Sequence, residues 1–323
     1  MAESNAKKNR IYSGIGGQAV LEGVMMKNKD NYAVAVRKPD GTVHVEKKKL
    51  SYDTKSLSRR IPFVRGIVNF IDSLSLGMDI LSYSSNFMDE AEEEDGVLDK
   101  LFKKLFGKHA ESIAMGLTMV SSILIAVLLF MFIPYAASEL LSRYIKNEIA
   151  VLLIEGALRL SVFLIYVAAI ALAKDIKRLY QYHGAEHKCI NCIEQGKSLD
   201  VKNVRESSRY HKRCGTSFML LIVVISIILC FFIRSDSRLV MMAYRLLLIP
   251  VVAGIAYEIL RLAGTRESMI LDIISAPGLC LQRITTKEQD DEMIEVAIAS
   301  VEAVFDWREF KAENFPGSER SDP

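Results

Sequence analysis

The chain has 323 residues, of which 50% are hydrophobic and 25% are charged, and its formal net charge is +2 at pH 7. An ordinary soluble domain with this share of charged residues has fewer apolar ones, and a pure transporter has fewer charged ones. The composition therefore disfavours both classes and favours a chain with apolar residues gathered in membrane-spanning helices and charges gathered in soluble parts.

Residues 1–60 are predicted to form a cytosolic region with a small β element. The first 14 residues lack the apolar segment of a signal peptide, and the glycine-rich stretch 14–27 lacks the Gly-Lys-Ser/Thr ending of a phosphate-binding loop. Residues 32–46 are typical of a β-hairpin, because both arms are rich in β-branched and apolar residues and Pro39-Asp40-Gly41 forms a turn.

Residues 61–88 are predicted to form an amphipathic helix. Its apolar stripe consists of Val64, Ile67, Val68, Ile71, Leu74, Met78 and Leu81. The position of this helix before the first long apolar stretch favours a place in the membrane interface over a place in a soluble core. Residues 89–112 begin with an acidic run and are predicted to be a solvated linker followed by a short helix.

Four apolar stretches are candidates to cross a lipid bilayer, which requires ~20 residues. In chain order they are Ile113–Ala137, Ile149–Ala173, Thr216–Ile233 and Leu239–Ala263. Regions 113–173 and 216–263 are thus each predicted to hold two transmembrane helices. Glu155 and Arg159, four residues apart in the second stretch, are predicted to neutralise each other, because charges at that depth cost ~2.5–3.5 kcal/mol each.

Lysine and arginine residues concentrate in the N-terminal part and in the segment 174–215. By the positive-inside rule, this segment is predicted to be a cytosolic loop between two pairs of spans, and both termini are predicted to lie in the cytoplasm. Residues 264–323 are predicted to form a cytosolic C-terminal helix and tail. The expected fold is a mainly α-helical polytopic membrane protein with about four transmembrane helices, the small β element and cytosolic helices.

The segment 174–215 also holds three of the five histidines and three of the five cysteines of the chain. An odd set of clustered cysteines disfavours a secreted disulfide framework and favours reduced thiols. One interpretation starts from His183, Glu186 and His187, which form an H-x-x-E-H string. On a helix, two such histidines hold one zinc ion while the glutamate acts as general base, with a third ligand from His211 or Cys214.

A second interpretation pairs Cys189 and Cys192 with His211 and Cys214. The two-residue spacing within each pair is that of structural zinc knuckles, in which four protein ligands leave no site for water. The metal, zinc or another divalent ion, would then hold the shape of the loop and would not catalyse a reaction.

Several strings of this sequence resemble the bacterial YqhQ family along nearly the whole chain. They are Gly16–Met26, Tyr182–Lys188, His211–Ser217, Ala276–Leu279 and Thr285–Glu288. Members of this family of unknown function are often described as predicted metal-dependent enzymes. The resemblance implies a bacterial plasma-membrane protein, and it favours the histidine-led site because the family strings do not clearly include both Cys189 and Cys192. It also implies that Gln18 and Glu22 border the site, and the same strings contain Lys188 and Arg213 as further candidates.

Two functions from different classes follow. The first is a membrane-embedded, zinc-dependent hydrolase that acts at the cytosolic face with Glu186 as its catalytic residue. The second is a non-catalytic factor in membrane-protein biogenesis that binds the Sec translocon, the ribosome or another membrane complex, since a basic face attracts RNA or anionic lipid. A homo-oligomer in the lipid bilayer is compatible with both.

Overall fold

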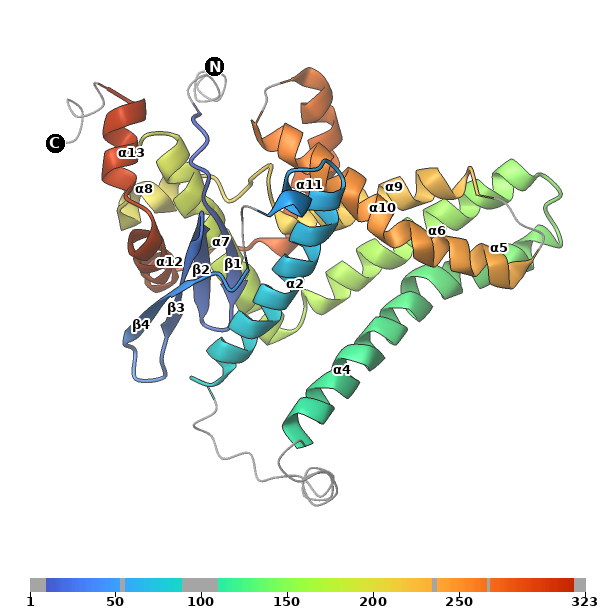
Figure 1. The fold of residues 1–323 in the computed structure, drawn as a ribbon, viewed down its shortest axis with the longest axis horizontal. Coiled ribbons are helices and arrows are strands. Elements are labelled where there is room, and N and C mark those ends of the chain that lie inside the picture. Colours follow the sequence, from blue (N-terminus) through green and yellow to red (C-terminus); the bar gives the residue numbers. More distant parts are fainter. Residues whose placement is uncertain (1–9, 53–55, 89–109, 234–236, 266–267, 317–323) are drawn as a thin grey trace. The chain divides into compact units, whose positions relative to one another are not determined.

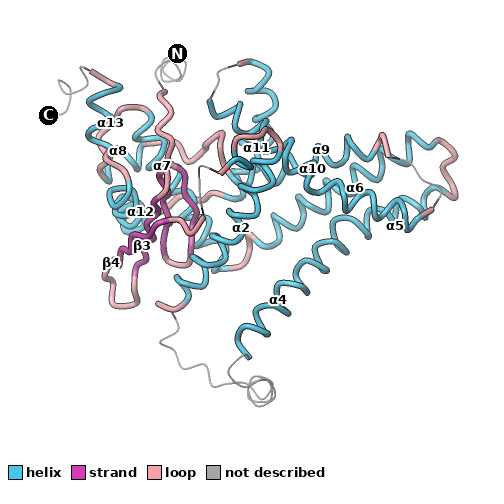
Figure 2. Tube along the Cα trace, viewed as in Figure 1, coloured by secondary structure: helices cyan, strands magenta, loops and turns pink. Residues whose placement is uncertain are grey.

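The computed structural model describes residues 10–52, 56–88, 110–233, 237–265 and 268–316. Helices make up most of these residues, and the strands form one small sheet (Figure 2). The chain divides into two compact units, one formed by Met1–Met88 with Ile170–Pro323 and the other by Asp89–Ala169. The predicted mainly helical fold with a small N-terminal β element is confirmed. The acidic linker predicted at 89–112 lies largely outside the described residues.

The sheet is an antiparallel meander in the order β1-β2-β3-β4 (Figure 1). Its strands are β1 (Gly16–Val20), β2 (Gly23–Asn28), β3 (Asn31–Arg37) and β4 (Val43–Lys49). The predicted hairpin corresponds to β3 and β4, which pair from Arg37 opposite Val43 to Asn31 opposite Lys49. The glycine-rich stretch, for which the sequence indicated no element, supplies β1 and β2.

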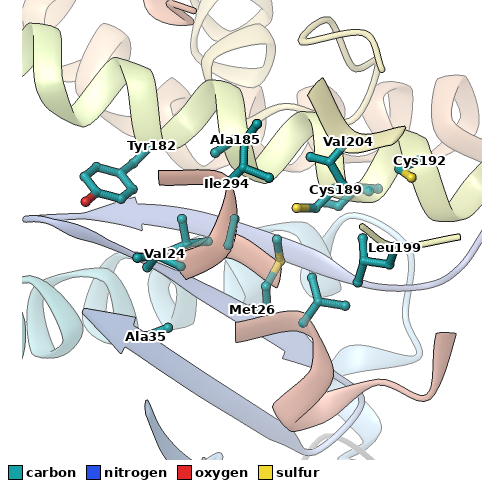
Figure 3. Packing of buried hydrophobic residues seen from close by; sticks show 14 of the residues in the cluster. Val24, Met26, Ala35, Tyr182, Ala185, Cys189, Cys192, Leu199, Val204 and Ile294 are labelled. Atoms are coloured by element: carbon teal, nitrogen blue, oxygen red, sulfur yellow. The ribbon is translucent and has the colours of Figure 1, made fainter. Parts of the chain in front are cut away.

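One face of the sheet is covered by helices from the middle and the end of the chain (Figure 1). These helices are α7 (Lys174–Glu194), α8 (Val201–Glu206) and α12 (Asp291–Val304), with α13 (Trp307–Asn314) beside them. Val24 and Met26 of β2 point into this core, where Figure 3 shows them near Ile294. Met25, between them, points to the opposite face and packs near Ile80 of α2 (Val64–Ser85). This is the two-residue alternation of a strand buried on both faces.

The segment 174–215, predicted to connect two pairs of spans, is largely helical, and the second half of α7 is deeply buried. Every residue of α7 from Gly184 to Glu194 is buried. Because these residues include histidine, glutamate, lysine and asparagine, the hydropathy of the sequence does not predict that they are buried. Hydrogen bonds to other parts of the chain, described below, compensate for their removal from water.

The apolar helices of the same unit are α9 (Gly215–Cys230), α10 (Arg238–Thr265) and α11 (Met269–Thr285). Ile225 of α9 packs against Val252 and Ala256 of α10. The α2 helix crosses α10 at glycines, where a Cβ added to Gly66 would lie 2.9 Å from the Cα of Gly254. Residues 264–323 were predicted to form one helix and a tail, and they contain three helices, α11, α12 and α13.

The second unit consists of α4 (Ala110–Val127), a π-helical segment (Leu128–Phe132), α5 (Ile133–Ser142) and α6 (Glu148–Ile170). Glu155 and Arg159 of α6 are both buried and form an ion pair with N–O distance 2.8 Å, as predicted. Among the described residues, three helical segments are long and apolar enough to cross a membrane: Gly116–Ser142, Glu148–Ile170 and Val240–Thr265. The α9 helix is equally apolar but shorter, with 16 residues.

Packing of β1 on α7 leaves no room for a side chain at Gly17. A Cβ there would lie 2.6 Å from Cγ of Glu186 and 2.8 Å from both the Met25 carbonyl oxygen and Sδ of Met26. We expect Gly17→Ala to lower the free energy of unfolding by about 1–3 kcal/mol through overpacking, measured by thermal or denaturant unfolding of the purified protein in detergent.

Gly16→Ala is the matched control, because no atom lies within 4 Å of a Cβ at that neighbouring position. Its effect should stay within about 0.5 kcal/mol. Equal destabilisation by the two substitutions would contradict the packing argument.

Candidate metal centre

The two faces of α7 have different chemistry. His183, His187, Ile190 and Glu194 follow the spacing that places residues on one side of an α-helix, and all but Glu194 line a cavity of about 440 Å³. The opposite side packs into the apolar core beneath the sheet. The helix therefore brings polar side chains to a cavity while its other face anchors it.

Both cavity histidines are oriented by main-chain carbonyl groups. Nδ1 of His183 lies 2.9 Å from the carbonyl oxygen of Thr285, and Nδ1 of His187 lies 2.6 Å from that of Arg209. A carbonyl oxygen only accepts hydrogen bonds, so each Nδ1 donates its hydrogen and Nε2 is the ring nitrogen left to face the cavity. This arrangement is typical of metal-binding histidines, whose second ring nitrogen is held by an outer partner.

Cys214 completes the group from another element. It is the N-cap residue of α9, where its sulfur accepts a hydrogen bond from the Thr216 amide, and its Sγ lies 3.2 Å from Nε2 of His183. Burial disfavours the thiolate, but the charges of His183 and His187 outweigh this effect and hold the pKa of Cys214 well below its ordinary value. Cys214 is therefore a thiolate, which is the form that binds metals and attacks electrophiles.

The donor atoms fit a zinc ion. One ligand atom each from His183, His187 and Cys214 lie within 4.8 Å of one another. Tetrahedral zinc with ordinary Zn–N and Zn–S bonds separates its ligands by roughly 3.5 Å, so small movements suffice for binding. Burial opposes the charged form of His183, but the neighbouring Cys214 raises the pKa of His183 to about 9, so a metal ion would displace the proton from its Nε2 on binding. Two imidazoles and one thiolate then form a donor set that suits zinc.

Glu186 stands beside these ligands. Its carboxylate lies 3.6 Å from Nε2 of His187 and 3.9 Å from Nε2 of His183, and it accepts a hydrogen bond from the Gly17 amide. Burial raises the pKa of Glu186, and the two neighbouring histidines offset only part of that shift. A carboxylate with a raised pKa is a stronger base than an ordinary carboxylate, which suits it to accept a proton.

His211 lies next to the group but is engaged elsewhere. Its Nε2 is 3.3 Å from Nη2 of Arg213 and 3.6 Å from the Glu194 carboxylate, and its main chain exchanges two hydrogen bonds with the buried side chain of Gln282. Burial lowers the pKa of His211 to about 4. Burial opposes ionisation of Glu194, but His211 and Arg213 together lower the pKa of Glu194 to about 2. The candidate ligand His211 therefore borders the cavity as a neutral side chain held by Arg213, Glu194 and Gln282.

Cys189 and Cys192 lie on the other side of α7, within the apolar core (Figure 3). Burial raises the pKa of Cys189 well above its ordinary value and that of Cys192 to about 12, so both are neutral thiols. Within the described part of the chain, the only group of three or more possible ligands is that of His183, His187 and Cys214. The structure thus does not gather the four residues of the zinc-knuckle interpretation.

The remaining candidate residues take structural positions. Gln18 packs against Gly77 of α2, and Glu22 forms an ion pair with Arg178. Lys188 donates hydrogen bonds to the Arg205 carbonyl and the Glu288 carboxylate. Of the four additional candidates, only Arg213 lines the cavity.

Sequence reasoning missed two contributions from α11. Gln282 holds the segment that carries His211, and the carbonyl of Thr285 orients His183. No local pattern marks a carbonyl or a single glutamine as part of a site. The string Thr285–Glu288 resembles a helix capping box and a family motif, but neither pattern indicates that the Thr285 carbonyl orients a histidine.

Comparisons with known proteins agree with that resemblance. A family model described as "Protein of unknown function (DUF1385)" matches residues 61–307. The chain is similar to the "Uncharacterized protein YqhQ" of Bacillus subtilis (strain 168), with 36% identity over 295 residues that cover 91% of this chain and 92% of the relative. No solved structure matches the chain.

The depressed pKa of Cys214 predicts unusual reactivity in metal-free protein. Its alkylation by iodoacetamide should be nearly as fast at pH 6 as at pH 9, because a thiol with a lowered pKa is still ionised at pH 6. A thiol of pKa about 8.5 loses about two orders of magnitude over that range. Mass spectrometry of each cysteine-containing peptide measures both rates.

Cys189 and Cys192 serve as internal controls and should stay unmodified at both pH values, since they are buried and their pKa values are raised. A steep fall in the rate at Cys214 on acidification would show that His183 and His187 do not stabilise its thiolate.

Proposed function

The chain belongs to the DUF1385 family, and on that premise we propose that it is a membrane-bound, zinc-dependent hydrolase. In this proposal His183, His187 and Cys214 hold the metal, and Glu186 is the general base. The observation that carries it is the convergence of two imidazole Nε2 atoms and one thiolate beside a buried carboxylate.

The number of ligands favours a catalytic role over a structural one. Structural zinc sites have four protein ligands, whereas catalytic sites have three and keep one position for water or substrate. His183, His187 and Cys214 supply three ligands, and all three line the same cavity. A fourth position facing that cavity is therefore open to a water molecule.

Zinc supplies a Lewis acid that lowers the pKa of a nearby water molecule and polarises a substrate carbonyl. Glu186 would take a proton from the attacking water at a carboxylate oxygen as the water oxygen bonds to the carbonyl carbon, and would pass it to the leaving group as the bond between that carbon and the leaving group breaks. The Gly17 amide, which donates to Glu186, and the two histidines keep this carboxylate in place. The centre is thus assembled from α7, which carries His183, Glu186 and His187, from Gly17 of β1 and from Cys214 at the start of α9.

We also propose that the protein crosses the bacterial plasma membrane four times. Gly116–Ser142, Glu148–Ile170 and Val240–Thr265 provide three spans. The 16 residues of α9 extend roughly 24 Å at 1.5 Å per residue, somewhat less than the ~30 Å hydrocarbon core, but apolar residues Phe231–Ile233 continue it. With an even number of spans both termini lie on the same side of the membrane, and the lysines and arginines of residues 174–215 favour the cytoplasm for the termini and the metal centre.

Metal analysis of purified variants tests the ligand set. Wild type should bind roughly one zinc ion per chain, and His187→Ala and Cys214→Ala should each abolish tight binding. Cys189→Ala should keep the metal, because its thiol lies in the apolar core. Glu186→Gln should also keep the metal and instead lower kcat/KM for hydrolysis of p-nitrophenyl acetate by about 10²–10⁴-fold, the range for loss of a general base.

Zinc loss in Cys189→Ala alongside wild-type binding in His187→Ala would overturn the ligand assignment. Full hydrolytic activity of Glu186→Gln would leave the metal centre without a catalytic role. That result would favour the non-catalytic alternative of a biogenesis factor with translocon or ribosome partners, which stays a prediction.

Topology reporters test the fourth span. A reporter fused after Ser237, between α9 and α10, should be active as alkaline phosphatase and dark as green fluorescent protein, because that position lies outside the cytoplasm in the four-span arrangement. Fusions after Pro323 should show the opposite result. Fluorescence at both positions would mean that α9 does not cross the membrane.

A further inference from the structure

Three cationic side chains line the cavity above the candidate metal centre, whereas its acidic groups, Glu186 and the Cys214 thiolate, belong to the centre itself. The cations are Lys27, Lys29 and Arg213, and Glu186 is the one carboxylate among the described lining residues. Arg213 is already neutralised by Glu194, which lies behind the cavity wall. Lys27 and Lys29 are therefore the cations whose charge remains available to a bound molecule.

Neither lysine is paired with an acid in the part of the chain that the structure describes. Nζ of Lys27 donates to the hydroxyl of Tyr52 at 2.8 Å, which is a neutral partner. No hydrogen bond or ion pair of Lys29 is formed with any described residue. Ordinary surface lysines often have nearby acids or face open solvent, whereas these two line a concave site that holds the candidate metal ligands.

The backbone at Lys29 supports a role beyond solvation. Lys29 adopts a left-handed conformation with φ 52° at the turn between β2 and β3, a position where a residue other than glycine or asparagine costs of order 1–3 kcal/mol. Strained residues of this kind cluster at binding and catalytic sites. Such a turn favours glycine at this position. The chain has Lys29 there instead, and Lys29 lines the cavity.

Lys27 reaches the cavity because of the glycines of β1. It lies directly opposite Gly16, and no atom lies within 4 Å of a Cβ at Gly16. Gly14 and Gly17 also line the cavity. The absence of side chains at Gly14 and Gly16, where no atom lies within 4 Å of an added Cβ, therefore leaves this part of the cavity wall open.

We infer that the substrate carries an anionic group, a carboxylate or a phosphate, which Lys27 and Lys29 bind while the scissile carbonyl lies over His183, His187 and Cys214. This inference rests on the proposed hydrolase function. The cavity of about 440 Å³ is within the range of small-molecule sites. The substrate class is thus a compact anionic amide or ester, and fixed lysine charges select it by electrostatic complementarity.

Three hydroxamates, which chelate the metal in the same way, test the inference on the full chain loaded with cobalt in detergent. Acetohydroxamate is neutral, succinic acid monohydroxamate carries a carboxylate, and phosphonoacetohydroxamate carries a phosphonate. Titration of the cobalt absorption bands gives each dissociation constant without any turnover. At least one anionic probe should bind about tenfold more tightly than acetohydroxamate, and the two anionic probes distinguish carboxylate from phosphate.

The double variant Lys27→Gln/Lys29→Gln should lose this preference and keep its affinity for acetohydroxamate. Lys47→Gln/Lys49→Gln removes the same charge from exposed positions of β4 that do not line the cavity, and it should keep the preference. The preference of wild type should also shrink as salt rises from about 0.05 M to about 1 M, because exposed charges are screened.

Equal affinity of wild type for all three probes would overturn the inference and leave the metal centre standing, and so would a preference that survives in Lys27→Gln/Lys29→Gln. Absence of a cobalt spectrum, or failure of every hydroxamate to perturb it, would overturn the proposed function and this inference together.

Discussion

The centre depends on two hydrogen bonds from imidazole Nδ1 atoms to main-chain carbonyls. The carbonyl of Thr285 belongs to the end of α11, and that of Arg209 to the segment between α8 and α9. Each bond fixes a ring orientation and a tautomer, and each links α7 to a different part of the chain. Each Nε2 then faces the side of the cavity that holds Cys214. The three metal ligands therefore converge only when α7, α9 and α11 have packed together.

The polar groups of α7 explain why a helix of this composition can be buried. Lys188 is compensated by Glu288, Asn191 donates to the carbonyls of Ser208 and Tyr210, and Glu194 pairs with Arg213. Buried polar groups that have hydrogen-bond partners add little to the net free energy of folding, but removal of one partner destabilises the fold strongly. The network therefore specifies the position of α7 more than it stabilises the fold, and the apolar core on the opposite face supplies the packing.

Local sequence patterns predicted the elements whose burial depends on apolar side chains. The hairpin of β3 and β4 followed from β-branched arms around a turn, and the apolar helices followed from their length and composition. The Glu155–Arg159 pair followed from helical spacing and the cost of an isolated charge. The burial of α7 within the segment 174–215 did not follow from local patterns, because the partners that satisfy its polar side chains are distant in sequence.

The sequence by itself determined the residue types of the centre and their local spacing. His183, Glu186 and His187 share a helical face whatever surrounds them. Only the tertiary structure decided between the two ligand sets. It places Cys214 at the start of α9 beside His183, and it buries Cys189 and Cys192 on the apolar side of α7. The physical reason is that ligand convergence depends on how distant elements pack, and spacing along one helix carries no information about that packing.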